Sequence, residues 1–231
     1  MHKYKVVRFA DLPSTQIYAR DLVATRAARD HIAILADMQS AGIGKRGNKF
    51  VSPKGNLYFS CILNEIRDPR AAYCVALAAS DALLECKVPN KVKWPNDVYA
   101  GGGKISGSII DNMDGFTIIG VGVNLINKPE FPDYPTSCAL DLGHEIKRDD
   151  ILNVLLDSLD FWLDTLAGGD FEAIRAEWLR RAAWLDEEVL YKDAPAIFTG
   201  IDETGALTIE QNDEQIRIIG TESPIKWPRN K

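Results

Sequence analysis

The sequence has few of the residues that build metal centres or disulfide frameworks. Its 231 residues include four cysteines and three histidines, and no two cysteines are spaced as C-x-x-C. Neither a zinc site nor a set of disulfides is indicated. The G-x-S-x-G and H-E-x-x-H motifs of common hydrolases are also missing. Cys61 and Cys74 are flanked by apolar residues, so they are interpreted as buried hydrophobic side chains rather than nucleophiles.

Long apolar runs and an excess of positive charge are missing as well. No segment approaches the length of a membrane span, and no apolar stretch follows the basic residues at the start. We therefore expect a cytoplasmic protein without a membrane partner. The net charge of −6 argues against a dedicated DNA-binding protein. Any basic cluster is expected to serve a small anionic ligand.

What the sequence does contain is the composition of a globular protein, with 46% hydrophobic and 26% charged residues. Apolar runs separated by turn residues, together with amphipathic segments, predict an α+β fold with a mixed sheet and hairpins. Beyond about residue 186 only short strands are expected, so we predict domains 1–185 and 186–231, the second a small β-barrel-like unit. Helices are expected after Ser14 and over 70–86, 149–166 and 171–184, and strands over 31–36, 56–63, 91–94, 104–111 and 116–123.

A glycine-rich basic segment follows the strand expected over 31–36. Residues 42–49 interleave three glycines with three cations. Glycine lets backbone N–H groups crowd an anion, and the cations neutralise its charge. We interpret the segment as a cradle for a phosphate or an acyl phosphate.

Six short motifs occur in one order along the chain. They are Ser14-Thr15-Gln16, Gln39-Ser40-Ala41-Gly42-Ile43-Gly44-Lys45-Arg46-Gly47, Ser52-Pro53-Lys54-Gly55-Asn56-Leu57-Tyr58, Lys93-Trp94-Pro95-Asn96-Asp97, Lys104-Ile105-Ser106-Gly107 and Gly120-Val121-Gly122-Val123-Asn124. Together they resemble the biotin protein ligase family. The resemblance spans most of the chain, and 200–202 with 205–207 resemble the family's small C-terminal domain. It implies a catalytic domain with a mixed sheet flanked by helices, followed by an SH3-like barrel.

The resemblance implies a ligase that uses ATP to convert biotin to biotinyl-5'-AMP and then transfers biotin to a lysine of a biotin carboxyl carrier protein. Because a carboxylate attacks a phosphate, such a site needs cations, N–H donors and a divalent metal, here Mg²⁺. The metal ligands are left undetermined. The ligase pattern begins at Ser14, so we expect a monofunctional enzyme without a DNA-binding domain. A homodimer is left open.

The resemblance also assigns residues to roles. Lys104 is placed between the carboxylate of biotin and the phosphate, and Asp97 near the incoming acceptor lysine. Helix capping explains Ser14 and Thr15 equally well, an ordinary turn explains Asn124, and a structural hydrogen bond would explain Asp97. The implied biotin-binding residues are Ser14, Thr15, Gln16, Gln39, Gly42, Ile43, Gly44, Lys104 and Gly107. The implied ATP- and adenylate-binding residues are Lys45, Arg46, Phe50, Asn96, Lys104 and Asn124.

The glycine-rich segment departs from the family's pattern. Where the family usually carries the two arginines of Gly-Arg-Gly-Arg, this chain has Ile43 and Lys45, and Phe50 stands where a tryptophan is common. Lysine lacks the planar fork with which arginine makes paired hydrogen bonds. We therefore expect weaker retention of biotinyl-5'-AMP, although Phe50 can still stack on a purine.

Three other interpretations are open. A lipoate-protein ligase would share the chemistry and the central lysine. A catalytically weakened module that binds biotin or its adenylate would account for Ile43 and Lys45. A plain interaction protein built on the barrel would leave the ordered motifs unexplained. The Lys-Trp-Pro-Asn-Asp motif and the C-terminal barrel favour the biotin ligase.

Overall fold

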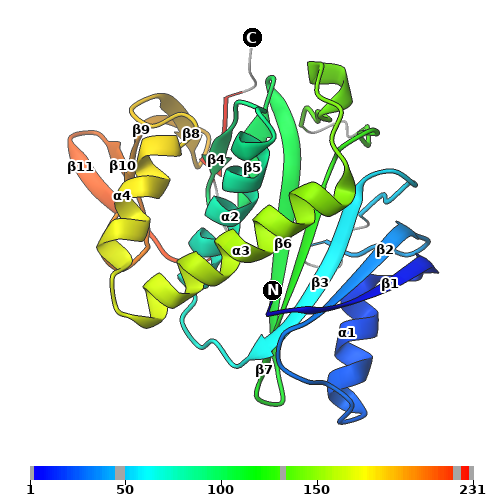
Figure 1. Cartoon of the computed structure of the whole chain (residues 1–231). Helices are drawn as coiled ribbons and strands as arrows, with labels where there is room; N and C mark the ends of the chain where they lie inside the picture. Colours follow the sequence, from blue (N-terminus) through cyan, green and yellow to red (C-terminus); the bar gives the residue numbers. More distant parts are fainter. Residues whose placement is uncertain (1–2, 45–49, 131–133, 221–224, 229–231) are drawn as a thin grey trace.

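A seven-stranded sheet forms the centre of the molecule (Figure 1). The computed structural model describes residues 3–44, 50–130, 134–220 and 225–228. The strand order is β1-β2-β3-β7-β6-β5-β4, in which β1 and β2 are parallel and the other neighbours are antiparallel. The strands are β1 (Lys5–Leu12), β2 (Ile32–Gln39), β3 (Leu57–Asn64), β4 (Lys91–Lys93), β5 (Asp97–Ala100), β6 (Gly103–Met113) and β7 (Phe116–Val123).

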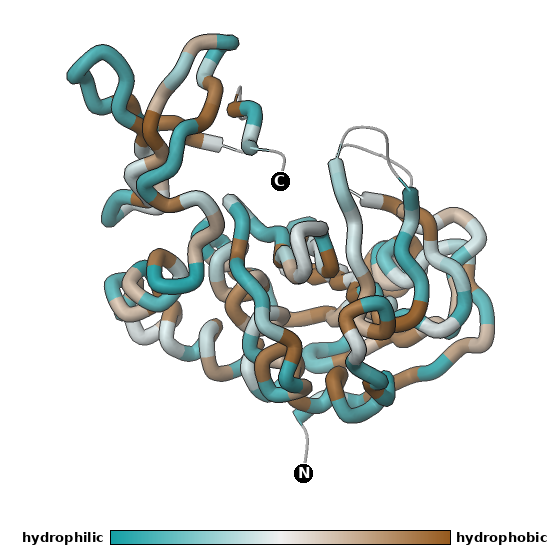
Figure 2. Tube along the Cα trace, turned by 90° about the horizontal axis from the view of Figure 1, so that it is seen from above, coloured by the Kyte–Doolittle hydropathy of each residue, from teal (hydrophilic) through white to brown (hydrophobic). Residues whose placement is uncertain are grey.

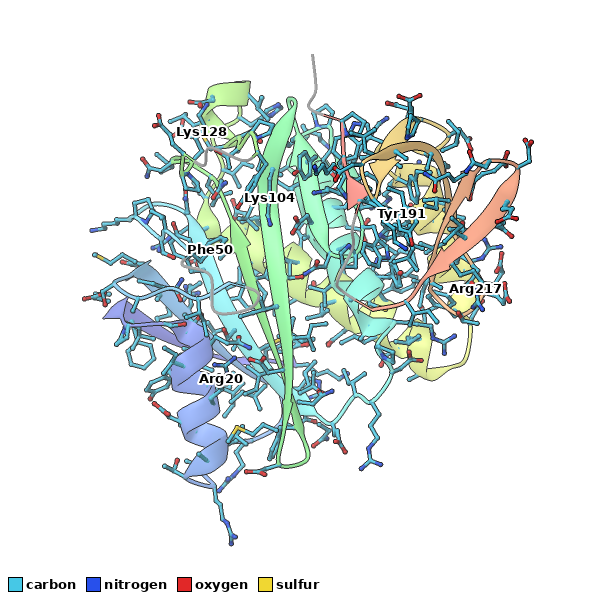
Figure 3. The ribbon with its side chains drawn as sticks, turned by 180° about the vertical axis from the view of Figure 1, so that it is seen from behind. Arg20, Phe50, Lys104, Lys128, Tyr191 and Arg217 are labelled. Atoms are coloured by element: carbon cyan, nitrogen blue, oxygen red, sulfur yellow. The ribbon has the colours of Figure 1, made fainter. Side chains whose placement is uncertain are left out.

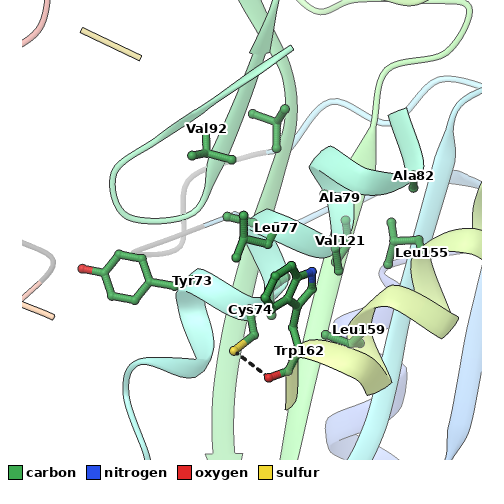
Figure 4. Packing of buried hydrophobic residues seen from close by; sticks show 14 of the residues in the cluster. Tyr73, Cys74, Leu77, Ala79, Ala82, Val92, Val121, Leu155, Leu159 and Trp162 are labelled. Carbon is green, nitrogen blue, oxygen red and sulfur yellow. Dashed lines mark hydrogen bonds between the residues drawn. The ribbon is translucent and has the colours of Figure 1, made fainter. Parts of the chain in front are cut away.

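Helices cover the two faces of this sheet unequally. Side chains alternate between the faces along each strand, so each strand contributes to both sides. Leu57, Phe59 and Cys61 of β3 belong to the main hydrophobic core on the side of α2 and α3. Figure 4 shows this packing, in which the Cys74 thiol donates to the Trp162 carbonyl at 3.4 Å. On the other face, α1 packs against only part of the sheet and leaves room for a cavity. The helices are α1 (Thr15–Ala24), α2 (Ala71–Glu85), α3 (Arg148–Ala167), α4 (Phe171–Arg181) and the 3-10 helix η2 (Leu140–Leu142).

A second, five-stranded antiparallel sheet follows α4 in the order β11-β10-β9-β8-β12. Seen from above (Figure 2), it lies at one end of the molecule. Phe198 and Leu207 of this sheet share one hydrophobic cluster with Trp178 of α4 and Leu77 of α2. The two sheets are therefore joined by continuous packing. The strands are β8 (Glu188–Tyr191), β9 (Ala194–Ile201), β10 (Leu207–Gln211), β11 (Glu214–Ile218) and β12 (Ile225–Lys226).

The predicted α+β fold with a mixed sheet is confirmed, and the differences have local causes. The helix expected to reach residue 184 ends at Arg181, because the Ala183 N–H donates to the Val92 carbonyl of β4 instead of continuing the helix. Three strands, β1, β5 and β12, were not predicted. The SH3-like form of the second sheet stays a prediction. In the part of the chain that the structure describes, no helix combines the length and apolarity needed to cross a membrane.

Tyr73 of α2 joins the two sheets through one buried hydroxyl group. The hydroxyl donates to the Gly205 carbonyl at 2.6 Å and accepts from the Trp94 indole N–H at 2.9 Å. Tyr73→Phe leaves both buried partners unsatisfied, so we expect the free energy of unfolding to fall by about 1–3 kcal/mol. Urea denaturation measures this change.

The matched control is Tyr18→Phe. The Tyr18 ring packs edge-on against Phe9, and its hydroxyl makes no hydrogen bond to any described residue. This control is expected to change the unfolding free energy by less than about 0.5 kcal/mol. Equal losses in the two variants would show that the Tyr73 hydroxyl contributes nothing to joining the sheets.

Candidate active site

A cavity of about 280 Å³ opens on the face of the central sheet that carries α1. Strand alternation places Ser60 of β3 opposite Gly120 of β7, and Tyr58 of β3 opposite Gly122, all on this face. Figure 3 shows Phe50 and Lys104 on this side of the sheet, with α1 below them. The cavity is thus bounded by the sheet, the start of α1 and the segment around Phe50.

Three glycines of β6 and β7 lie on the floor of the cavity, and the side chains of other residues pack directly over them. A Cβ atom at Gly120 would come within 2.5 Å of Gln16 Oε1, and one at Gly122 within 2.6 Å of the Phe50 ring. A Cβ atom at Gly107 would lie 2.8 Å from Lys104 Cε. A side chain at any of these three positions would therefore displace the neighbouring side chain from its place over the sheet. Gly120 and Gly122 lie within β7, whose bounds Phe116–Val123 match the strand predicted over 116–123.

An ion pair between Lys104 and Asp97 lies at the middle of the cavity. The Lys104 ammonium is 2.7 Å from Asp97 Oδ1, and each side chain is 21% exposed. The register of β5 and β6 places Asp97 opposite Gly107, and the lysine side chain folds back over that glycine. The ring of Tyr134 lies 5.8 Å from the ammonium. The structure thus brings together the two residues predicted to be catalytic, and the carboxylate orients the cation.

A chain of hydrogen bonds lines the end of the cavity nearest α1. The Thr15 backbone N–H donates to Gln39 Oε1 at 2.8 Å, and Gln39 Nε2 donates to the Ser52 hydroxyl at 2.8 Å. The hydroxyls of Thr15 and Ser60 lie 2.9 Å apart. Ser60 also donates to Gln16 Oε1 at 2.8 Å. These groups are buried or half-buried, so their mutual bonds hold each one in a fixed direction.

Two predicted biotin-binding residues, Ser14 and Gln16, also make hydrogen bonds within the protein. Ser14 is the N-cap of α1, where its hydroxyl accepts from the Ile17 N–H, so the capping interpretation is confirmed although Ser14 also lines the cavity. Gln16 Nε2 donates to Asp111 at 2.6 Å and to the Ile118 carbonyl at 3.3 Å. Since Gln16 Oε1 accepts from Ser60, both ends of the Gln16 amide are already bonded.

The glycine-rich segment enters the cavity by only part of its length. Ile43 and Gly44 line the cavity, whereas Gly42 is buried at the base, where its carbonyl accepts from the Phe50 N–H at 2.8 Å. Gly42 is not among the residues that line the cavity, and its assignment to biotin stays a prediction. The predicted contacts of Lys45 and Arg46 fall outside the described residues.

The residues predicted for the adenylate are divided between this cavity and a smaller neighbour. Asn96 lines the main cavity and donates to the Ser108 backbone carbonyl. Asn124 lines the smaller one, and its Nδ2 donates to the Ser137 carbonyl at 3.0 Å. Phe50, Lys104, Gly107 and Tyr134 line both cavities. The two cavities are therefore neighbours that share a wall, and Lys104 is part of that wall.

Several lining residues were missed by the sequence interpretation. Ser60 was detectable as the one hydroxyl within an apolar strand, and Lys93 as the first residue of the Lys-Trp-Pro-Asn-Asp motif. Tyr99 carried no signal, because strand pairing alone brings it to the cavity.

Metal-ligating residues are sparse at this site. Within the described ranges, no three His, Cys, Asp or Glu side chains cluster as a metal site would require, and Asp97 is the only carboxylate that lines the main cavity. The interpretation of Cys61 and Cys74 as buried side chains is confirmed. Burial raises the pKa of each thiol to about 12, which keeps both protonated and unreactive.

Comparison with known proteins identifies the family of this chain. The model of the biotin/lipoate A/B protein ligase family matches residues 7–124, and the chain belongs to this family. The sequence is 33% identical over 198 residues to the biotin–(acetyl-CoA-carboxylase) ligase of Paracoccus denitrificans, covering 76% of this chain and 82% of that protein.

More distant relatives and solved structures agree with this assignment. The bifunctional ligase/repressor BirA of Escherichia coli is 28% identical over 222 residues, covering 87% of this chain and 68% of that protein. The biotin protein ligase of Aquifex aeolicus, solved in complex with biotin and ATP, superposes with a TM-score of 0.86 at 26% identity. That superposition covers 99% of this chain and 100% of the other. The similarity thus includes both sheets.

The Ser60 hydroxyl is expected to stabilise the hydrogen-bonded side chains near α1. Ser60→Ala leaves Gln16 Oε1 and the Thr15 hydroxyl without this partner in a buried place, so we expect a loss of about 1–3 kcal/mol in unfolding free energy. The control is Ser158→Ala on α3, a half-buried serine without a hydrogen bond to any described residue. If both variants unfold at the same urea concentration, the hydrogen bonds of Ser60 to Gln16 and Thr15 do not contribute to stability.

Proposed function

We propose that the protein uses ATP to convert biotin to biotinyl-5'-AMP and transfers the biotinyl group to a lysine of a biotin carboxyl carrier protein. The observation that carries this proposal is the Lys104–Asp97 ion pair, whose lysine lines both cavities, in a chain of this ligase family. Relatives named as biotin–(acetyl-CoA-carboxylase) ligases support the substrate and the acceptor, and a similar ligase bound to biotin and ATP supports the nucleotide.

Biotin would occupy the end of the main cavity nearest α1. Its ureido ring requires directional donors and acceptors within an otherwise apolar wall. Ser14, Thr15 and Gln39 are the groups we assign to this ring. Gln16 would act as a positioning residue, since its amide is bonded to Ser60 and Asp111. Lipoate has no ureido group, so the same hydrogen-bonding side chains would be left unmatched by it.

The nucleotide would place its adenine between the Phe50 ring and Asn124, where the smaller cavity of about 10 Å³ would have to widen to receive it. A carboxamide can pair with both N6 and N7 of adenine, but Asn124 Nδ2 is bonded to the Ser137 carbonyl. Pairing with adenine therefore requires the hydrogen bond from Asn124 to the Ser137 carbonyl to be exchanged for one to the base. Asn96, Lys45 and Arg46 remain part of the proposed adenylate site.

Lys104 would act at the first chemical step. A biotin carboxylate oxygen attacks the α-phosphorus of ATP, and the bond from that phosphorus to the bridging oxygen of pyrophosphate breaks. Both reactants are anionic, so a fixed cation between them reduces their repulsion and stabilises the charge of the transition state. Asp97 holds the Lys104 ammonium in place, and in the second step it would accept a hydrogen bond from the acceptor amine.

Mg²⁺ would reach this site on the phosphates of ATP. The ion commonly binds one or two carboxylates together with substrate phosphates, and Asp97 is the carboxylate that the described cavity offers. This donor set fits an ion carried by the nucleotide. When bound, the ion would neutralise phosphate charge.

The remaining parts of the proposal concern organisation and surroundings. We propose a catalytic unit over 1–185 and a small C-terminal unit over 186–231, supported by the second sheet that begins at Glu188. We also propose a cytoplasmic location without DNA as a partner, which the net charge of −6 supports.

Lys104→Ala tests the assignment of the central cation. We expect the rate of biotin-dependent pyrophosphate release in a single turnover to fall by at least about 1,000-fold, because the variant removes the cation assigned to the position between the two anions. The control is Lys5→Ala, which removes an exposed lysine of β1. Normal pyrophosphate release by a folded Lys104→Ala protein would rule the assignment out.

Ile43→Arg tests the expected weak hold on the intermediate. A regained charge-assisted hydrogen bond is worth about 1.5–3 kcal/mol, so biotinyl-5'-AMP should leave about ten- to a hundredfold more slowly. Stopped-flow measurement of the dissociation rate provides the comparison with the unmodified protein. Ile43→Gln serves as the uncharged control of similar reach. An unchanged rate in Ile43→Arg would mean that this position does not limit retention.

A further inference from the structure

Lys93 of β4 is a second cation of the main cavity to which the family resemblance assigned no role. It lies directly opposite Asp97 in the β4–β5 register, and Asp97 lies opposite Gly107 in the β5–β6 register. Because the Lys104 side chain folds over Gly107, three charged groups form a row across three strands, with the carboxylate between two cations.

Aromatic rings hold the Lys93 side chain in this row. Its ammonium lies 5.3 Å from the centre of the Tyr99 ring and 5.8 Å from that of Trp227, next to β12. Trp184 packs against both rings, at 5.3 and 5.6 Å between centroids. Trp184 adopts a left-handed backbone with φ of 59°, which is unusual for a bulky residue and needs firm packing to persist. The rings therefore support Lys93 without neutralising it.

The charge of Lys93 is poorly compensated by the described part of the protein. Within those ranges its ammonium makes no hydrogen bond and no ion pair within 4 Å, and Asp97 Oδ1 is already bonded to Lys104. Burial lowers the pKa of Lys93, and the nearby Lys104 lowers it further, against the opposite effect of Asp97. An anion that enters the cavity would compensate this charge and be bound by it.

The position of Lys93 indicates which anion it would meet. The residues assigned to biotin come from α1 and β2, and Lys104 comes from β6. Lys93 lies on β4, which is five strands away from β2 in the sheet. Five strand spacings correspond to about 24 Å across the sheet. In an in-line displacement, the leaving group departs on the side opposite the attacking oxygen. With biotin on the β2 side of Lys104, the leaving group emerges on the side of Lys93.

We propose that Lys93 binds the β- and γ-phosphates of ATP and then the pyrophosphate that leaves. This inference rests on the proposed biotin adenylation. As the carboxylate oxygen bonds to the α-phosphorus, the electron pair of the breaking bond passes to the bridging oxygen of pyrophosphate, and the Lys93 cation offsets the charge that develops there. In the reverse direction the same cation binds the pyrophosphate that attacks biotinyl-5'-AMP.

The test separates the two half-reactions in the full-length chain. Lys93→Met keeps the apolar stem on the aromatic rings and removes the charge. Starting from preformed biotinyl-5'-AMP, we expect the KM for pyrophosphate in ATP formation to rise at least about tenfold. Transfer of biotin from the same adenylate to a biotin carboxyl carrier domain, without pyrophosphate, should stay within about twofold.

Three further variants sharpen the result. Lys91→Met removes an exposed lysine of the same strand, two residues away, and should leave both half-reactions unchanged. Lys93→Arg should restore the pyrophosphate KM to within about threefold, because the charge returns. Trp227→Leu weakens the aromatic support and leaves the charge, so a smaller rise in the same KM is expected even if Lys93→Met folds poorly.

Two outcomes overturn the inference. An unchanged pyrophosphate KM in folded Lys93→Met and in Trp227→Leu would show that Lys93 does not touch the leaving group. A fall in transfer to the carrier domain with an unchanged pyrophosphate KM would assign Lys93 to the acceptor amine instead. Failure of the unmodified protein to form biotinyl-5'-AMP at all would contradict the proposed function itself, which makes the two failures distinguishable.

Discussion

The ion pair between Lys104 and Asp97 is the contact on which the organisation of the site depends. It requires β5 and β6 in a register that sets Asp97 opposite Gly107, and it requires glycine there so that the lysine can fold back over the strand. Lys104 then lines both cavities. A cation fixed in advance stabilises a transition state without reorganisation during the reaction. The sheet therefore acts as a rigid support for one charge.

The two faces of the sheet have divided roles, which follows from side-chain alternation along β3 and β7. On one face, apolar residues such as Phe59 and Val121 pack beneath α2 and α3 and supply the main core. On the other face, Ser60, Gly120 and Gly122 leave space and provide a polar group. Stability and ligand binding can thus be served by the same strands. The second sheet adds Trp227, which reaches Lys93 in the main cavity.

Much of the fold and part of the site could be predicted from the sequence, and the physical reasons differ between residues. The helix over 70–86 and the strand over 56–63 were predictable because their apolar content is strong and continuous. Lys104, Asp97 and Gln39 lie in short motifs that resemble a family. The contact of Lys104 with Asp97 depends on strand register, and the bonds of Gln16 depend on a residue 95 positions away. Such long-range pairings leave no local pattern.

The claim that this cavity adenylates biotin is tested most directly by ATP–pyrophosphate exchange with the purified protein. Labelled pyrophosphate, ATP and Mg²⁺ are incubated with biotin in one reaction and with lipoate at the same concentration in another. If Thr15 and Gln39 bind the ureido ring as we propose, exchange depends on biotin and is absent with lipoate. Exchange driven by lipoate but not by biotin, or exchange with neither acid, would contradict the account.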